Sequence, residues 1–448
     1  MEQLLAGAAR TVITPPIGYA SGIWGLRQGR STGVHRDLHA RSLVIDNGAT
    51  RLAIVSLEVT GLTMEIVRAI KDRVCRLTGI PADNILLNST HNHTSPNVFV
   101  GVPEELALYA TYLGELVSGC VAKAFHARVP ASTGHDYGNL PGWTVNRQYP
   151  DRPVDTEVGV LTIETADGAP LAKLVNFACH GVCDGGQYLE WSGDFSGEMS
   201  AVMEAAERGV VALHLQGAAG DVHPFDWWFG NHESKHMHTH EDTARLGRAL
   251  AGEALKVSAG TALRSVVTLD ANVSAVTMPR HRVGWTVDAA RALHEKLRAQ
   301  FGTYRGDTWP EGTTTANAAE RHPEQYGTGR NELTLATNQD HPAIQIQTRG
   351  FRVGDLLISA SPGELFNEHG QAIKNGLTGG RPWVASYCDE YVGYISTRKP
   401  HEEIADVPLE QIVDMKRFRR YYGTTTSPFA PEAGEALVDG SIAALQKL

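Results

Sequence analysis

The stretch that decides the fold is residues 51–93, which run RLAIVSLEVTGLTMEIVRAIKDRVCRLTGIPADNILLNSTHNH. Residues 51–57 form a short apolar run rich in branched side chains, which is typical of a buried strand. From Met64 to Thr78 the apolar side chains recur at helical spacing, and 84–88 is a second buried strand. A helix is expected from about Glu104 to His126. This β-α-β-α order predicts an α/β fold with a mixed, partly parallel sheet core and flanking helices.

The same alternation continues downstream, where apolar strands end in polar clusters. Strands are expected over residues 172–180, 210–216, 351–359 and 383–387. Each is closely followed by histidines, carboxylates or tyrosines. In open α/β sheets, sites are built at the carboxyl ends of the strands. We therefore expect a metal site at that edge of the sheet.

Composition narrows the class of protein. The 448 residues are 42% hydrophobic and carry a formal charge of −10, from 40 basic and 50 acidic side chains. No Lys/Arg-rich stripe stands out, which argues against nucleic-acid and anionic-membrane partners. The sequence has no signal-peptide pattern and no long apolar window, and its five cysteines are scattered and odd in number. These features predict a cytoplasmic protein, with a homo-oligomer possible.

No repeat or low-complexity linker divides the chain, so we expect a single catalytic domain over residues 1–448. Residues 304–338 are rich in Gly, Thr, Asn and Pro and predict an irregular insertion or lid. Residues 232–240 hold four histidines in nine positions and are expected to form an exposed loop, with a second metal site as the alternative.

Several side chains have chemistry that a site could use. His91 and His93 alternate on an extended segment, so at most one of them is expected to face a given metal. His180, between Cys179 and Cys183, is either a core histidine or a ligand.

Turns after the strands supply further candidates. Asp221 and His223 could bind metal, accept a proton or shape a turn, and Asp194 is a similar turn acid. Glu364 follows Pro-Gly and precedes an apolar run, which suggests the first turn of a helix.

Taken together, these segments resemble the catalytic domain of the neutral ceramidase family. The NSTHNHTSP segment at 88–96 is similar to the family's Thr-His-x-His-x-x-Pro signature. The other matching segments follow in family order over essentially the whole chain: ARTVITPP at 9–16, GVHRDLHAR at 33–41, Asn146-Arg147, FACH at 177–180, GDV at 220–222, PGE at 362–364 and GYIST at 393–397.

The resemblance implies four zinc ligands: His91, His180, Glu364 and Tyr394. It also implies that His93 is a second-sphere group near the reacting carbonyl and that Arg147 contacts the substrate or the developing oxyanion. Two imidazoles, a carboxylate and a phenolic oxygen suit Zn²⁺ and leave a position for water. Zinc lowers the pKa of that water toward 7 and polarises a carbonyl, as amide cleavage at neutral pH requires.

The chain also departs from the family pattern. His223 stands where the family has a serine after the Gly-Asp-Val turn, and we predict proton transfer or substrate contact for it, with Asp221 as the alternative proton carrier. The family's second tyrosine has no counterpart at the same spacing, so Tyr421 or Tyr422 is expected in its place, and Asp194 is a further substrate-binding candidate. We expect the chain to lack both the family's C-terminal β-sandwich and a signal peptide, which disfavours membrane ceramide as the substrate.

The sequence thus predicts a zinc-dependent hydrolase that cleaves an amide bond of a small soluble substrate. An esterase or lactonase with the same metal site stays open, as do a true ceramide (N-acylsphingosine) amidohydrolase and a non-catalytic binding protein on the same fold. Manganese or iron in place of zinc, and a second metal near His223 or Asp221, are also open.

Overall fold

The computed structural model describes most of the chain. The described ranges are 3–19, 30–99, 104–186, 188–225, 238–280, 342–378, 380–408 and 419–448, with isolated positions between them. The expected insertion at 304–338 and residues 232–237 of the histidine-rich segment lie outside the described residues. All five cysteines are described and free, so the expectation that they form no disulfide framework is confirmed.

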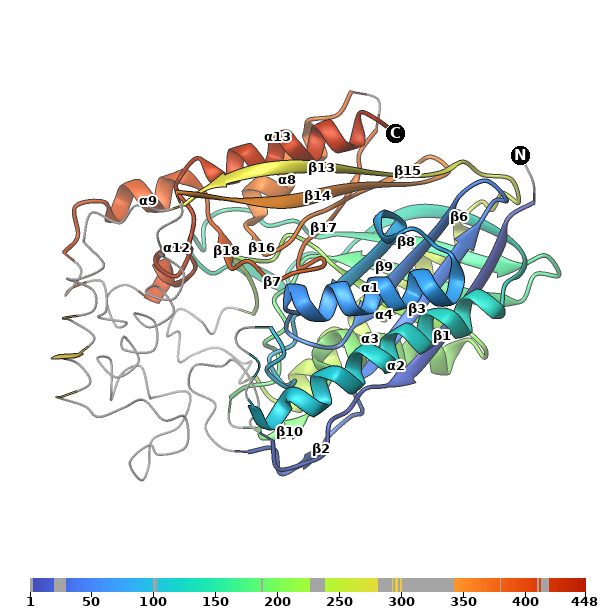
Figure 1. Cartoon of the computed structure of the whole chain (residues 1–448), viewed down its shortest axis with the longest axis horizontal. Helices are drawn as coiled ribbons and strands as arrows, with labels where there is room; N and C mark the ends of the chain where they lie inside the picture. Colours follow the sequence, from blue (N-terminus) through green and yellow to red (C-terminus); the bar gives the residue numbers. More distant parts are fainter. Residues whose placement is uncertain are drawn as a thin grey trace.

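An eight-stranded sheet forms the centre of the fold (Figure 1). Its strand order is β11 (Val211–Gln216), β9 (Pro170–Phe177), β8 (Glu157–Thr165), β6 (Val129–Asn139), β1 (Leu5–Val12), β3 (His39–Asp46), β4 (Arg51–Leu57) and β5 (Ile85–Ser89). The outer pairs β11/β9 and β4/β5 are parallel, and the pairs between them are antiparallel. The predicted mixed, partly parallel sheet is therefore confirmed.

A second, four-stranded sheet packs on the first. It contains, in order, β13 (Leu269–Pro279), β14 (Ala343–Val353), β15 (Leu356–Ala360) and β17 (Trp383–Ala385). The single strand expected over 351–359 is wrong, because Gly354-Asp355 forms a two-residue hairpin turn between β14 and β15, with φ of +63° at Gly354. Glycine adopts this conformation without steric cost.

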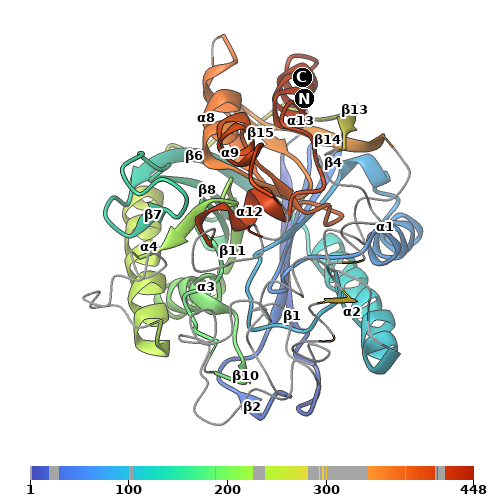
Figure 2. The same ribbon diagram turned by 90° about the vertical axis from the view of Figure 1, so that its left-hand side faces the viewer.

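Side-chain alternation divides the molecule into layers. In β3, Val44 packs with α1 (Met64–Thr78) and α2 (Ala107–His126), whereas Leu43 and Ile45 point toward the second sheet. The other half of the large sheet is covered by α3 (Asp194–Ala206) and α4 (His240–Gly260). In Figure 2 the pair α1–α2 lies to the right of the strands and the pair α3–α4 to the left.

The outer face of the second sheet has its own cover. It packs against α8 (Asn367–Asn375) and α13 (Ala433–Leu445), and α13 lies above the strands in Figure 1. The remaining short helical segments are α9 (Arg398–Ile404), α12 (Tyr422–Thr425), η1 (Ala82–Asn84), η2 (Glu104–Leu106) and η4 (Arg419–Tyr421). In the part of the chain that the structure describes, no helix is both long and apolar enough to cross a bilayer.

The carboxyl ends of the strands converge on one region. The edge strands β5 and β11 meet there, because Gln216 N donates to Asn88 Oδ1 at 2.8 Å and Gln216 Nε2 donates to the carbonyl of Thr90. Short pairs of strands complete the region: β7 (Thr144–Asn146) with β12 (Val222–Pro224), β16 (Glu364–Leu365) with β18 (Tyr394–Ile395), and β2 (Gly33–Val34) with β10 (Glu190–Trp191). The loops after β5, β9, β11 and β17 therefore face one another.

Candidate metal centre

Three buried histidines meet beyond the strand ends. His91 and His93 follow β5 and His180 follows β9, and one ring nitrogen from each lies within 4.8 Å of the others. The expectation that at most one of His91 and His93 faces this point is wrong. The backbone at His91 is not extended but has φ of +59°, so the alternation of a strand does not apply there. The Nε2 atoms of His91 and His93 lie 3.2 Å apart.

Hydrogen bonds fix the proton positions on two of these rings. His91 Nδ1 donates to the carbonyl of Thr60 at 2.7 Å, and His180 Nδ1 donates to the carbonyl of Ala219 at 3.0 Å. In the neutral rings, each Nε2 therefore carries a lone pair. Burial, followed by the charge of Arg147, holds the pKa of His180 well below its ordinary value, so this ring is neutral.

Glu364 completes the cluster. Its Oε2 lies 3.1 Å from His91 Nε2 and 3.7 Å from His180 Nε2, and all three side chains are buried. Among the described residues, this oxygen has no hydrogen-bond partner. Two imidazole Nε2 atoms and a carboxylate oxygen thus converge on one point, and a cation satisfies such a set of donor atoms. The residues therefore fit a divalent metal of the zinc type.

The strand pair β16/β18 places two predicted ligands side by side. Glu364 and Tyr394 are direct partners in this parallel pair. Gly363 directly precedes Glu364 and has φ of +74°. A Cβ at this position would lie 2.6 Å from Gly393 O, so only glycine lets the two strands lie this close together. Glu364 thus lies on a strand and not in the first turn of a helix, since α8 begins at Asn367.

Three tyrosines surround Glu364. Tyr391 donates its hydroxyl to Glu364 Oε1 at 2.6 Å, while Tyr394 Oη accepts from Arg147 Nη2 at 3.0 Å. Tyr387 stacks on the ring of His91, with centroids 4.2 Å apart. Burial, and then the charge of Glu364, raises the pKa of Tyr387 and of Tyr391 well above the ordinary tyrosine value, so both keep their protons.

Arg147 is a buried cation next to this group. Besides Tyr394 it contacts the carbonyl of Gly220, to which Nη2 donates at 2.5 Å. Burial disfavours its charge, but Tyr394 and Glu364 outweigh that effect and raise the pKa of Arg147. The guanidinium is thus held beside the predicted ligands, where it can stabilise negative charge.

Asp221 lies close by but is engaged with backbone and amide groups. Its Oδ1 accepts from Asn367 N at 2.6 Å, and its Oδ2 accepts from Asn146 Nδ2 at 2.7 Å. Burial raises the pKa of Asp221. Its carbonyl also accepts from Arg147 N at 2.8 Å, so Asp221 positions the segment that carries the arginine.

His223 lies on β12 next to His238, a member of the histidine-rich segment at 232–240. His223 Nδ1 donates to Pro224 O at 2.8 Å, and its ring centroid lies 5.3 Å from that of His238. His238 is buried and donates Nδ1–H to Val182 O, and His240 begins α4. The expectation of an exposed loop is therefore wrong for the described end of the histidine-rich segment, because tertiary contacts bury His238.

The two residues predicted to contact the substrate, Asp194 and Tyr421, both form hydrogen bonds within the protein. Asp194 is buried at the start of α3, where its oxygens accept from the backbone N–H groups of Asp184 and Phe195. Burial and then the neighbouring Asp184 raise the pKa of Asp194 to about 7.

Tyr421 donates to Glu403 Oε2 at 2.8 Å, and Tyr149, two residues after Arg147, donates to the same oxygen. The roles of Asp194 and Tyr421 toward a substrate stay predictions.

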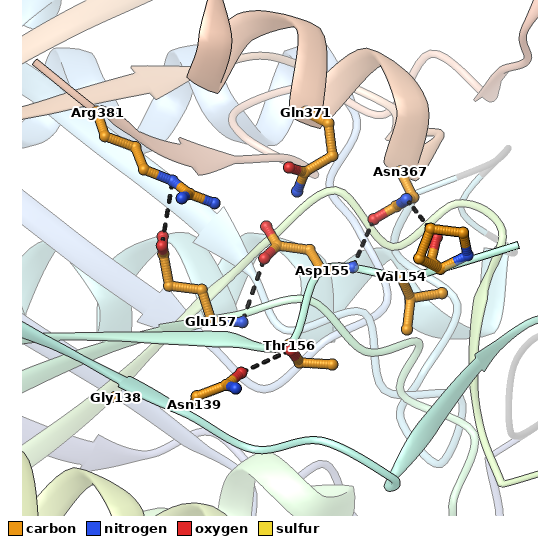
Figure 3. Close-up of a pocket in the computed structure, with 10 residues that line it drawn as sticks. Gly138, Asn139, Val154, Asp155, Thr156, Glu157, Asn367, Gln371 and Arg381 are labelled. Atoms are coloured by element: carbon orange, nitrogen blue, oxygen red, sulfur yellow. Dashed lines mark hydrogen bonds and ion pairs between the residues drawn. The ribbon is translucent and has the colours of Figure 1, made fainter.

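A separate polar pocket of about 400 Å³ opens between the ends of β6 and β8 and helix α8 (Figure 3). Its charged groups are paired with one another: Glu157 with Arg381, and both Asp155 and Glu157 with Lys374. Asn367 lines this pocket and also holds Asp221 through its backbone N–H. None of the predicted site residues lines it.

Comparison with known proteins supports the resemblance. The chain is 28% identical over 229 residues to neutral ceramidase A of Dictyostelium discoideum, a match that covers 43% of this chain and 32% of that protein. Neutral ceramidase B of the same organism is 27% identical over 225 residues, covering 43% and 31%. The matched region is thus about a third of the length of these curated relatives. No known family profile matches the chain.

Solved structures extend the likeness to the whole chain. The crystal structure of neutral ceramidase from Pseudomonas aeruginosa superposes on all of this chain and 75% of its own, with a TM-score of 0.73 and 16% identity. A ceramidase complexed with C2 covers all of this chain and 76% of its own, with a TM-score of 0.69 and 17% identity. Fold and site together define an α/β protein with a buried imidazole–carboxylate centre at the strand ends. Its fold is that of a neutral ceramidase-like catalytic domain.

Proposed function

We propose that this protein is a zinc-dependent hydrolase that cleaves an amide bond of a small soluble substrate in the cytoplasm. The observation that carries the proposal is the convergence of His91 Nε2, His180 Nε2 and Glu364 Oε2 in the interior, with the Nδ1 atoms of both rings bonded to backbone carbonyls. The names of the relatives, which are ceramidases, support amide cleavage.

His91, His180 and Glu364 would hold the ion, and Tyr394, paired with Glu364 across β16/β18, would complete the set. When bound, Zn²⁺ supplies Lewis-acid polarisation of the acyl carbonyl and lowers the pKa of water. His93 Nε2, close to His91, is available either as a third imidazole ligand or as a contact to the carbonyl.

The chain's own residues supply charge stabilisation and proton transfer. Arg147 is buried and held by Gly220 O, so its charge is fixed in place before a negative oxygen develops. His223 donates Nδ1–H to Pro224 O, which fixes its tautomer, and its Nε2 would take up a proton and pass it to the leaving nitrogen. Asp221 keeps the Arg147 segment in position through Asn146 and Asn367.

The test is metal content by mass spectrometry on untagged protein, comparing wild type with His180→Ala. We expect about one zinc per chain in wild type and a loss in the variant, whereas His135→Ala, on β6, should keep the metal. Two metals per chain would instead point to His223 as part of a second site. Wild type that takes up no metal would overturn the proposal.

A second candidate is hydrolysis of ceramide itself, which the names of the relatives favour. Matched small amides, esters and lactones, together with a short-chain fluorescent ceramide, separate these activities on zinc-loaded protein. Turnover of esters or lactones alone would favour the esterase or lactonase alternative. Zinc binding without turnover of any of them would indicate a binding protein on this fold.

A further inference from the structure

Tyr387 is built into the metal centre although no motif marks it. Its backbone N–H donates to Gly363 O at 3.0 Å, and its carbonyl accepts from Ser89 N at 3.1 Å. These two bonds connect the segment that precedes Glu364 with the segment that precedes His91. Tyr387 has φ of +57°, which a tyrosine rarely adopts outside a strongly determined site.

The ring of Tyr387 is enclosed by the site. It is 2% exposed, stacks on His91 and packs against Ala219 and Val222. These contacts need an aromatic ring but make no use of a hydroxyl. A phenylalanine would satisfy them equally well.

The hydroxyl of Tyr387 is buried and, among the described residues, has no hydrogen-bond partner. The ionisable groups that act on it are Glu364, Tyr394 and Arg147 of the metal centre, together with Asp221. By contrast, the hydroxyls of Tyr391 and Tyr394 both have partners in the same cluster. A buried donor without a partner is unfavourable, and it commonly marks the place where a ligand atom binds.

We propose that Tyr387 is a substrate-contacting residue, whose hydroxyl donates a hydrogen bond to the reacting acyl group. This inference rests on the proposed function. The acyl group is the part of an amide or ester that gains negative charge during hydrolysis, and a neutral O–H donor placed there stabilises that charge.

The test uses Tyr387→Phe, which keeps the ring on His91 and removes only the donor. We expect its zinc content to equal that of wild type and its kcat/KM on the best amide or ester to fall about 10- to 1000-fold. Acetohydroxamate, a small acyl compound that binds zinc, gives a readout without turnover. Its Kd for zinc-loaded protein, measured by calorimetry, should rise about tenfold in the variant.

Two further variants separate this role from others. Tyr391→Phe removes the donor to Glu364 Oε1 and should weaken zinc binding. Tyr137→Phe, at the exposed edge of β6, should change neither zinc binding nor Kd.

Loss of zinc from Tyr387→Phe would overturn the inference, because the hydroxyl would then support a ligand. Unchanged kcat/KM and unchanged acetohydroxamate affinity would overturn it as well. If wild type binds zinc and acetohydroxamate but hydrolyses nothing, the proposed function fails while the affinity of Tyr387→Phe still decides the contact.

Discussion

Glu364 Oε2 and His91 Nε2 lie 3.1 Å apart in the interior. His91 Nδ1 bonds to Thr60 O on the other side of the ring, and a second imidazole nitrogen, His180 Nε2, lies 3.7 Å from the same carboxylate oxygen. Backbone carbonyls thus orient both rings so that their lone pairs meet the carboxylate. Such outer hydrogen bonds fix the tautomer of metal-binding histidines.

This arrangement predicts opposite effects of Glu364→Gln with and without metal. The glutamine Oε1 can still accept from Tyr391, and its amide group can donate to the imidazole nitrogens. We expect metal-free Glu364→Gln to be more stable than metal-free wild type by about 1 kcal/mol in chemical denaturation. Zinc should raise the melting temperature of wild type but not of the variant.

Glu435→Gln is the matched control, because Glu435 forms an exposed ion pair with Arg398, and it should alter neither quantity. A destabilised metal-free Glu364→Gln that still responds to zinc would contradict the assignment of Glu364 as a ligand.

A substitution at Arg147 can separate the effect of its positive charge from the effect of its guanidinium geometry on catalysis. Arg147→Lys keeps the positive charge, but an ammonium group lacks the planar guanidinium that reaches both Gly220 O and Tyr394 Oη. We expect kcat/KM to fall about 10²- to 10³-fold with zinc content unchanged. Kinetics and metal analysis on one preparation check this, and a variant that loses its zinc would show that Arg147 supports Tyr394 and not the substrate.

Local signals explain which parts of the fold could be predicted. The bounds of α1 match the prediction, because its start and end depend on neighbouring residues: the Thr63 side chain accepts from Ile66 N, and the chain leaves the helix at Gly79. The hairpin turn within 351–359 also has a local signal, Gly354-Asp355, which the apolar run around it conceals.

The metal centre depends on contacts that no local pattern contains. The left-handed backbone at His91 is held by Val59 O, and His93 N donates to Gly181 O after a different strand. The resemblance to a known family could place His91 and His180 together, but the direction of the His93 ring follows from this tertiary framework. Tyr387 has no signal in the sequence, and the burial of His238 could not be read from its histidine-rich segment, since both side chains are buried by segments far along the chain.

A buried histidine outside the centre predicts acid sensitivity. Burial lowers the pKa of His214 from 6.5 to about 4. Between these values the unfolded chain binds a proton that the folded protein does not, so stability falls as the pH drops from 6.5 toward 4. The difference of about 2.5 pKa units corresponds to about 3 kcal/mol at most.

His214→Leu should remove this part of the pH dependence when urea denaturation is followed at pH 7 and at pH 4.5. His126→Gln, at the exposed end of α2, should keep it. An equal slope in wild type and His214→Leu would assign the acid sensitivity to other groups.

His223 gives the sharpest test of the proton transfer. With Nδ1–H held by Pro224 O, only Nε2 can exchange a proton with a substrate. We expect His223→Gln to keep its zinc, to lose about 10²- to 10⁴-fold in kcat, and to lack the limb of the pH–rate profile that reports the imidazole. Added imidazole should restore part of the activity of His223→Ala. His238→Gln, which changes the adjacent ring, should alter kcat less.

If His223→Gln instead keeps full turnover and the wild-type pH profile, His223 does not move the proton. Asp221 would then be the remaining candidate, although its two oxygens already accept from Asn367 and Asn146.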